Sequence, residues 1–155
     1  MIKYEELLTE VDDAGINIDE SFKFNGKTKG LYIDGNIALS SSLSSSTEKT
    51  CILAEELGHH YTSYGNIIDM NVTENRKQEL RARIWAYNKL VGLNGIINIY
   101  KAGCKTLHDA ANYLDVTEEF LSECIRCYRN KYGECTTLDN YVIYFEPTLG
   151  VLELV

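Results

Sequence analysis

The first residues of the chain alternate between apolar and acidic positions with the period of a helix. Ile2, Leu7, Leu8 and Val11 recur at close to 3.6-residue spacing, and Gly15 follows them. This spacing predicts an amphipathic helix that begins near Ile2 and ends before Gly15.

A second pattern surrounds the pair Asp34-Gly35. The short apolar runs Leu31–Ile33 and Ile37–Leu39 flank this pair, which readily adopts the positive φ angles of a tight turn. The pattern predicts a β-hairpin.

Helical periodicity returns after a run of serines. Ser45 precedes Glu48 by three residues, which is the spacing of a capping box, so a helix is expected over about residues 46–61. A second helix is predicted over residues 72–90. Its expected apolar stripe consists of Leu80, Ile84, Tyr87 and Val91.

The remaining sequence predicts shorter elements. Helices are expected over residues 96–102, 107–114 and 118–132, and a terminal β-ribbon over 141–145 and 151–154. Together these elements predict an α+β fold with a helical core, a hairpin and a carboxy-terminal ribbon.

Length and composition fit one globular domain. The 155 residues are 45% hydrophobic and 25% charged, and no composition shift marks a linker. We expect a single domain over residues 1–155. It would comprise a hairpin and core at 28–92, a helical pair at 104–132 and the ribbon at 134–155.

The charge balance limits the class of partner. The chain has 23 acidic and 15 basic residues, and its net charge of -8 disfavours direct contact with nucleic acids or anionic membranes. No apolar run reaches the length of about 18 residues that a membrane span needs, and the first residues do not resemble a signal peptide. We therefore expect a cytoplasmic protein whose five cysteines are reduced.

The segment ILAEELGHH at residues 52–60 carries the candidate chemistry. Residues four apart on a helix differ by about 40° around the axis, so Glu55 and His59 can bind one ion together. Glu56 has the position of a general base, and Glu79 on the next predicted helix can be a third ligand. Such a carboxylate-rich set suits Zn²⁺, with Mn²⁺ or Fe²⁺ as further candidates.

Each of these residues also has a purely structural interpretation. Adjacent glutamates are commonly a solvated helix face, and Gly-His-His can be the end of a helix. Glu79 can form an i, i+4 ion pair with Arg83 instead of binding a metal.

Three segments in order resemble the ImmA/IrrE family of metallopeptidases, which is known from mobile elements and prophages. They are Gly30–Leu39, Leu53–His59 and Glu79–Ala86, and the likeness spans most of residues 28–130. The resemblance implies a zincin-like core in which His59 and Glu79 bind zinc and Glu56 is the base. Glu55 replaces the first histidine of the family's motif. Small Ala82 would let the two helices approach closely.

The resemblance implies a cytoplasmic metal-dependent endopeptidase that cleaves a specific regulatory protein, such as a DNA-binding repressor of a phage or mobile element. The strand edge at Ile37–Leu39 is expected to hold the substrate, and His60, Tyr61 or Tyr64 could stabilise an oxyanion. The alternative is a non-catalytic or weakly metal-binding protein that acts by binding a repressor.

Two further patterns have competing interpretations. Residues 106–128 have the form of a helix-turn-helix unit, but its second helix carries three glutamates, which favours a scaffold over DNA binding. Cys124 and Cys127, with Cys135 nearby, could bind a metal, but Cys124 also fits the apolar stripe of its helix. We expect Cys124 and Cys127 to be reduced, largely buried and metal-free.

Overall fold

The computed structural model describes residues 3–62 and 72–155 of the chain. The chain forms two compact units, residues 1–86 and 87–155, which are described in turn. The predicted α+β class is confirmed. The single domain expected over residues 1–155 stays a prediction.

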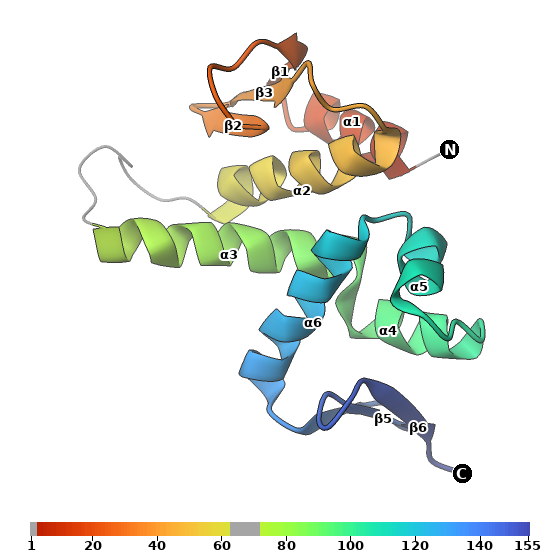
Figure 1. Ribbon diagram of the computed structural model, residues 1–155. Helices are drawn as coiled ribbons and strands as arrows, with labels where there is room; N and C mark the ends of the chain where they lie inside the picture. Colours follow the sequence, from red (N-terminus) through yellow and green to blue (C-terminus); the bar gives the residue numbers. More distant parts are fainter. Residues whose placement is uncertain (1–2, 63–71) are drawn as a thin grey trace. The chain divides into compact units, whose positions relative to one another are not determined.

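The first unit places a small sheet on helix α2. Its elements are α1 (Lys3–Asp13), β1 (Asn17–Phe22), β2 (Gly30–Ile33), β3 (Asn36–Ser40), α2 (Ser46–Thr62) and most of α3 (Val72–Leu90). Within this unit α2 lies between the sheet and α3 (Figure 1). The core joins apolar side chains of every layer: Tyr4, Leu7, Val11, Ile37, Leu39, Leu53, Ala54 and Leu57 are all buried.

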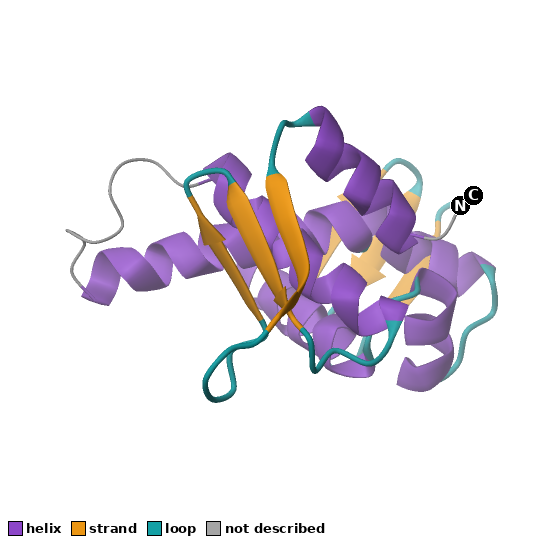
Figure 2. Ribbon diagram, turned by 90° about the horizontal axis from the view of Figure 1, so that it is seen from above, coloured by secondary structure: helices purple, strands orange, loops and turns teal. Residues whose placement is uncertain are grey.

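The hairpin of β2 and β3 is confirmed. Asp34 and Gly35 have φ angles of 45° and 79°, as the tight turn requires. The strand order is β1-β3-β2, with β3 parallel to β1 and antiparallel to β2 (Figure 2). Because β3 is paired on both sides, the expectation that Ile37–Leu39 forms a substrate-binding edge is wrong. The strand next to β3 in the hairpin, β2, forms an open edge of the sheet.

Helix α2 begins where the capping pattern predicts. The Glu48 amide donates to Ser45 Oγ at 3.1 Å, and Ser44 Oγ donates to Glu48 Oε1 at 3.0 Å. The first of these contacts satisfies an amide donor that a helix start leaves without a partner. Ile2, where the amino-terminal helix was expected to begin, lies outside the described residues.

Helix α3 has the predicted bounds, and Tyr87 and Val91 of the predicted stripe are buried, but the earlier part of the helix buries a different face. Leu80, expected in the apolar stripe, is 51% exposed, whereas Gln78, Ala82 and Ala86 are buried in the first unit. The reason is close packing on α2. A Cβ atom built on Gly58 would lie 2.9 Å from the Ala82 carbonyl carbon. Small side chains therefore serve this face better than leucine does.

The second unit contains three helices and an antiparallel sheet. Its elements are α4 (Gly92–Lys101), α5 (Leu107–Leu114), α6 (Glu118–Tyr132), β4 (Cys135–Leu138), β5 (Tyr141–Tyr144) and β6 (Gly150–Glu153), with strand order β4-β5-β6. Helix α4 begins four residues earlier than predicted: Gly92 begins it with a left-handed φ of 65°, and Gly95 lies inside it. The apolar side chains of Ile96, Ile97 and Ile99 are buried.

The α5–α6 turn has the expected form. Asp115 ends α5 with a left-handed φ of 56°, and Thr117 Oγ1 accepts the Phe120 amide at the start of α6. On α6, Phe120, Leu121, Cys124 and Tyr128 are buried. Cys127, expected to be largely buried, is only half-buried. Burial raises the pKa of the Cys124 thiol to about 12, so this cysteine behaves as a core residue.

The contact of Gly58 with α3 leads to a first prediction. Gly58→Ala should lower the free energy of unfolding by about 1–3 kcal/mol, because the added methyl group would overlap the Ala82 backbone. The matched control is Gly95→Ala within α4, where the nearest atom would be a Val91 methyl group at 3.4 Å. This control should be neutral or stabilising, as alanine favours helices. Urea unfolding measures both, and equal effects of the two substitutions would contradict the packing argument.

Candidate metal centre

Helices α2 and α3 bring two of the predicted ligands together. His59 Nε2 lies 3.3 Å from Glu79 Oε1, and the side chains are 15% and 55% exposed. The close approach of Gly58 to Ala82 makes this contact possible, because these residues neighbour His59 and Glu79 on their helices. The pair joins the last turns of α2 to the early turns of α3.

The His59–Glu79 pair influences the charge of both residues. The hydrogen bond to Glu79 raises the pKa of His59 despite partial burial, and the nearby carboxylates add to the effect. The hydrogen bond to His59, with the charge of Arg83, lowers the pKa of Glu79. Since Arg83 affects Glu79 by its charge, the predicted alternative partner is also close.

Glu56 lies on the adjacent face of α2, under strand β2. His59 is three positions after Glu56, so the two side chains project about 60° apart. Glu56 is only 8% exposed. Burial raises its pKa from 4.5 to about 7, His59 opposes that rise, and Glu55 and Glu79 add to it. The residue is therefore a buried carboxyl that exchanges a proton near neutral pH.

Glu55 is near this group without completing it. Its charge acts on Glu56 and on His59, and it lies one turn before His59 on α2. Among the described residues, however, no three His, Cys, Asp or Glu side chains are gathered closely enough to hold a metal ion. The structure thus brings His59 and Glu79 into contact and leaves Glu55 beside them.

The donor set can be compared with the geometry of zinc. Two ligands at about 2.0–2.1 Å from a tetrahedral zinc lie about 3.3 Å apart. The distance of 3.3 Å between His59 Nε2 and Glu79 Oε1 matches that separation. The separation of these two atoms is thus compatible with a shared zinc ion as well as with the hydrogen bond, whereas Glu55 would have to move to join them.

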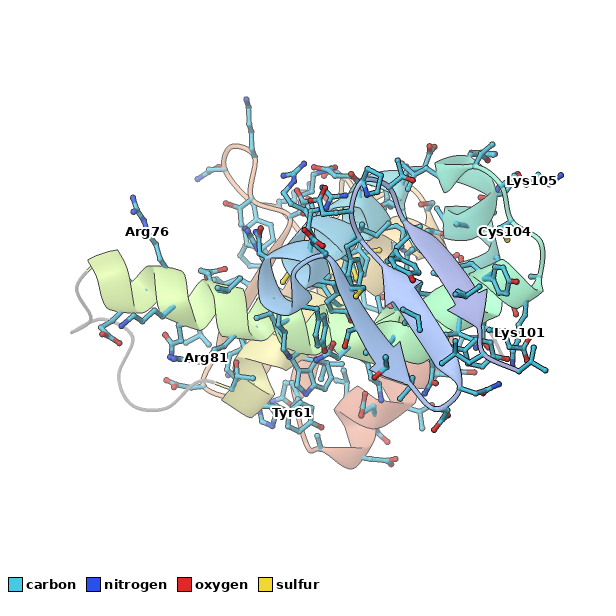
Figure 3. The ribbon with its side chains drawn as sticks, turned by 90° about the horizontal axis from the view of Figure 1, so that it is seen from below. Tyr61, Arg76, Arg81, Lys101, Cys104 and Lys105 are labelled. Atoms are coloured by element: carbon cyan, nitrogen blue, oxygen red, sulfur yellow. The ribbon has the colours of Figure 1, made fainter. Side chains whose placement is uncertain are left out.

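The other candidates near the site are engaged in ring contacts. His60 Nδ1 lies 2.7 Å from Tyr32 Oη, and Tyr61, labelled in Figure 3 in the last turn of α2, stacks on Trp85 with centroids 5.1 Å apart. Tyr64 lies outside the described residues. Neither contact assigns an oxyanion donor.

Sequence reasoning missed two residues of β2. A Cβ on Gly30 would lie 2.9 Å from Glu56 Oε1, and Tyr32 holds His60. The two residues are two apart in a strand, so they share the face toward α2. That alternation is the signal that could have identified them.

Comparison with known families identifies the class to which this site belongs. Residues 11–126 match the peptidase M78 family, described as the IrrE N-terminal-like domain, which is zincin-like and typically zinc-dependent. The match covers most of the chain, and the chain belongs to this family. Searches of curated proteins and of solved structures find no match. None of the described helices is long and apolar enough to cross a membrane.

The burial of Glu56 leads to a second prediction, for protein treated with a chelator. Folding raises the pKa of Glu56, so this carboxyl group stabilises the folded state most at pH values below its unfolded pKa of 4.5. That stabilisation is lost as the pH rises through about 7. Glu56→Gln cannot ionise. Its stability relative to the wild type should therefore increase by about 2 kcal/mol between about pH 5.5 and about pH 8.5.

Urea unfolding at the two pH values measures this difference. Glu119→Gln on α6 is the control, because Glu119 is exposed. A stability difference between wild type and Glu56→Gln that does not change with pH would contradict the burial argument.

Proposed function

We propose that the chain is a metal-dependent endopeptidase that cleaves a specific regulatory protein. One observation carries the proposal: the buried carboxyl of Glu56 lies beside the His59–Glu79 pair, within the residues that match the family. A peptidase of this class needs a base and metal ligands in that arrangement.

His59, Glu79 and Glu55 would hold the metal. His59 supplies an imidazole nitrogen, and the two glutamates supply carboxylate oxygens, so one coordination position would stay open. When bound, zinc supplies Lewis acidity toward the scissile carbonyl and toward the attacking water. The additional carboxylate in place of a histidine makes the site harder and more anionic, which also suits Mn²⁺ or Fe²⁺.

Glu56 would act as the general base. The Glu56 carboxylate would accept a proton from water and return it to the leaving amine. Its burial under Gly30 restricts access of bulk water to the carboxyl group.

Strand β2 would bind the substrate backbone. The Ser40 amide donates to the Lys29 carbonyl at 2.8 Å, so alternate β2 residues from Lys29 onward bond to β3. Gly30 and Tyr32 then direct their amide and carbonyl groups to the other side, where no described strand pairs with them. An extended peptide could add to this edge beside Glu56.

The charge of the chain favours a basic protein partner. The net charge of -8 suits the positively charged surface of a DNA-binding repressor, and it disfavours direct contact with nucleic acid. We propose such a repressor, of a phage or mobile element, as the substrate and the cytoplasm as the compartment.

Glu55 favours a second candidate function. A protein with this weaker ligand set could bind a repressor without cleaving it. Against this alternative, Glu56, His59 and Glu79 are all present, and a protein that only binds a partner has no need for a buried base. Metal content and repressor cleavage distinguish the two functions.

The third prediction tests the chemistry directly. With zinc added, wild type should cleave a repressor encoded beside it, Glu56→Gln should lose cleavage by at least about a hundredfold but still bind zinc, and His59→Ala should lose both. Gel electrophoresis follows repressor cleavage, and inductively coupled plasma mass spectrometry measures the zinc content of each protein. Glu119→Gln and His108→Ala, at exposed sites of the second unit, are the matched controls. Undiminished cleavage by Glu56→Gln would exclude the proposed base.

The fourth prediction concerns the altered ligand. Glu55→His introduces a nitrogen donor one turn before His59, so zinc should bind more tightly and survive dialysis better than in wild type. Calorimetric titration with zinc measures the change, and Glu119→His is the control for an added surface histidine. Unchanged zinc affinity in Glu55→His would place Glu55 outside the metal centre.

A further inference from the structure

Strand β2 contacts helix α2 at two points, and both lie beside the proposed chemistry. At Gly30 the strand backbone lies against the helix, because an added Cβ would be 2.5 Å from Ile52 Cγ2 and 2.9 Å from Glu56 Oε1. At Tyr32 the contact is polar: Tyr32 Oη lies 2.7 Å from His60 Nδ1. These contacts fix the strand along the helix.

The Tyr32 hydroxyl connects three parts of the first unit. It accepts the amide of Gly35 in the hairpin turn at 3.1 Å, so its own hydrogen is available for His60 Nδ1. The Tyr32 and His60 rings also meet edge to face, with centroids 5.4 Å apart. One side chain thus holds the hairpin turn, the strand and α2.

The ring contacts continue to α3. His60 packs edge to face on Tyr61 at 4.9 Å, and Tyr61 stacks on Trp85 at 5.1 Å. The series Tyr32, His60, Tyr61 and Trp85 therefore crosses from β2 through α2 to the helix that carries Glu79. Aromatic contacts of this kind stabilise the folded protein by more than the burial of their surface area alone.

We propose that Tyr32 and His60 are positioning residues that hold the open edge of β2 in register with Glu56. This inference rests on the proposed peptidase function. A peptide bound to the amide and carbonyl groups of Gly30 and Tyr32 is placed relative to Glu56 only as precisely as β2 itself. Displacement of a bound peptide by about 1 Å can slow a reaction by about a hundredfold.

The test combines amide exchange with cleavage kinetics, using full-length protein with zinc added. Tyr32→Phe keeps the ring and removes the hydroxyl, so exchange of the Leu31 and Ile33 amides should accelerate about fivefold, the effect of one lost hydrogen bond. Cleavage should slow by about tenfold or more in kcat/KM, while zinc affinity is unchanged, because neither residue is a ligand.

Substitutions at His60 make the test specific for the bond. His60→Asn keeps a polar atom near the position of Nδ1 and should retain much of the activity, whereas His60→Phe should match Tyr32→Phe. The double variant Tyr32→Phe/His60→Phe should be little worse than either single variant, because both remove the same interaction. Tyr144→Phe on β5, an exposed tyrosine of the other sheet, is the control and should change nothing.

The outcomes separate this inference from the proposed function. Normal exchange and normal kcat/KM in Tyr32→Phe, or fully additive effects in the double variant, would overturn the positioning role. Faster amide exchange in Tyr32→Phe would still show that the Tyr32–His60 contact fixes β2, even if zinc-loaded wild type cleaves nothing. The absence of cleavage by wild type would reject the peptidase proposal.

Discussion

The contact between Gly58 and Ala82 is the constraint on which the site depends. Helices with larger side chains at their contact lie about 8–10 Å apart, and small residues permit a closer approach. Here the approach is close enough that Gly58 has no room for a Cβ atom beside the Ala82 backbone. At that spacing His59 from one helix contacts Glu79 from the other.

The same packing creates an electrostatic problem that the site has to resolve. Glu55, Glu56 and Glu79 bring three carboxyl groups near one imidazole, and burial of Glu56 favours its neutral form. The raised pKa of Glu56 and the His59–Glu79 hydrogen bond are two responses of the protein to this crowding. A divalent cation would be a third response. A base whose ionised form costs energy in a partly enclosed site is a common feature of enzymes and an uncommon one of passive surfaces.

Most elements could be predicted from the sequence, because their signals are local. The turn at Asp34-Gly35, the cap at Ser45 and the bounds of α3 depend on a few adjacent residues. Strands β1 and β4 were missed because β1 alternates poorly and β4, with the sequence CTTL, has few large apolar residues. Most of their side chains are exposed or half-buried, and backbone pairing defines them instead. Leu80 was misplaced because apolar spacing does not reveal that α2 requires small partners.

The residues of the site also differ in whether a local sequence signal identifies them. Glu55, Glu56 and His59 could be found from helix spacing, and Glu79 from a second motif. The contact of Tyr32 with His60 depends on how a strand crosses a helix, which no short-range pattern encodes. The true open edge, β2, depends on the parallel pairing of β1 with β3, and β1 had not been predicted.

The position of β2 also helps to interpret the glutamate at position 55. At Gly30 the backbone of β2 lies close to α2, because a Cβ atom there would approach Ile52 and Glu56. The strand therefore lies against the Glu56 carboxyl group, with the amide and carbonyl groups of its open edge nearby. The first unit thus brings together the buried carboxyl of Glu56, the His59–Glu79 pair and an open strand edge, and Glu55 changes the donor chemistry beside them and not their placement.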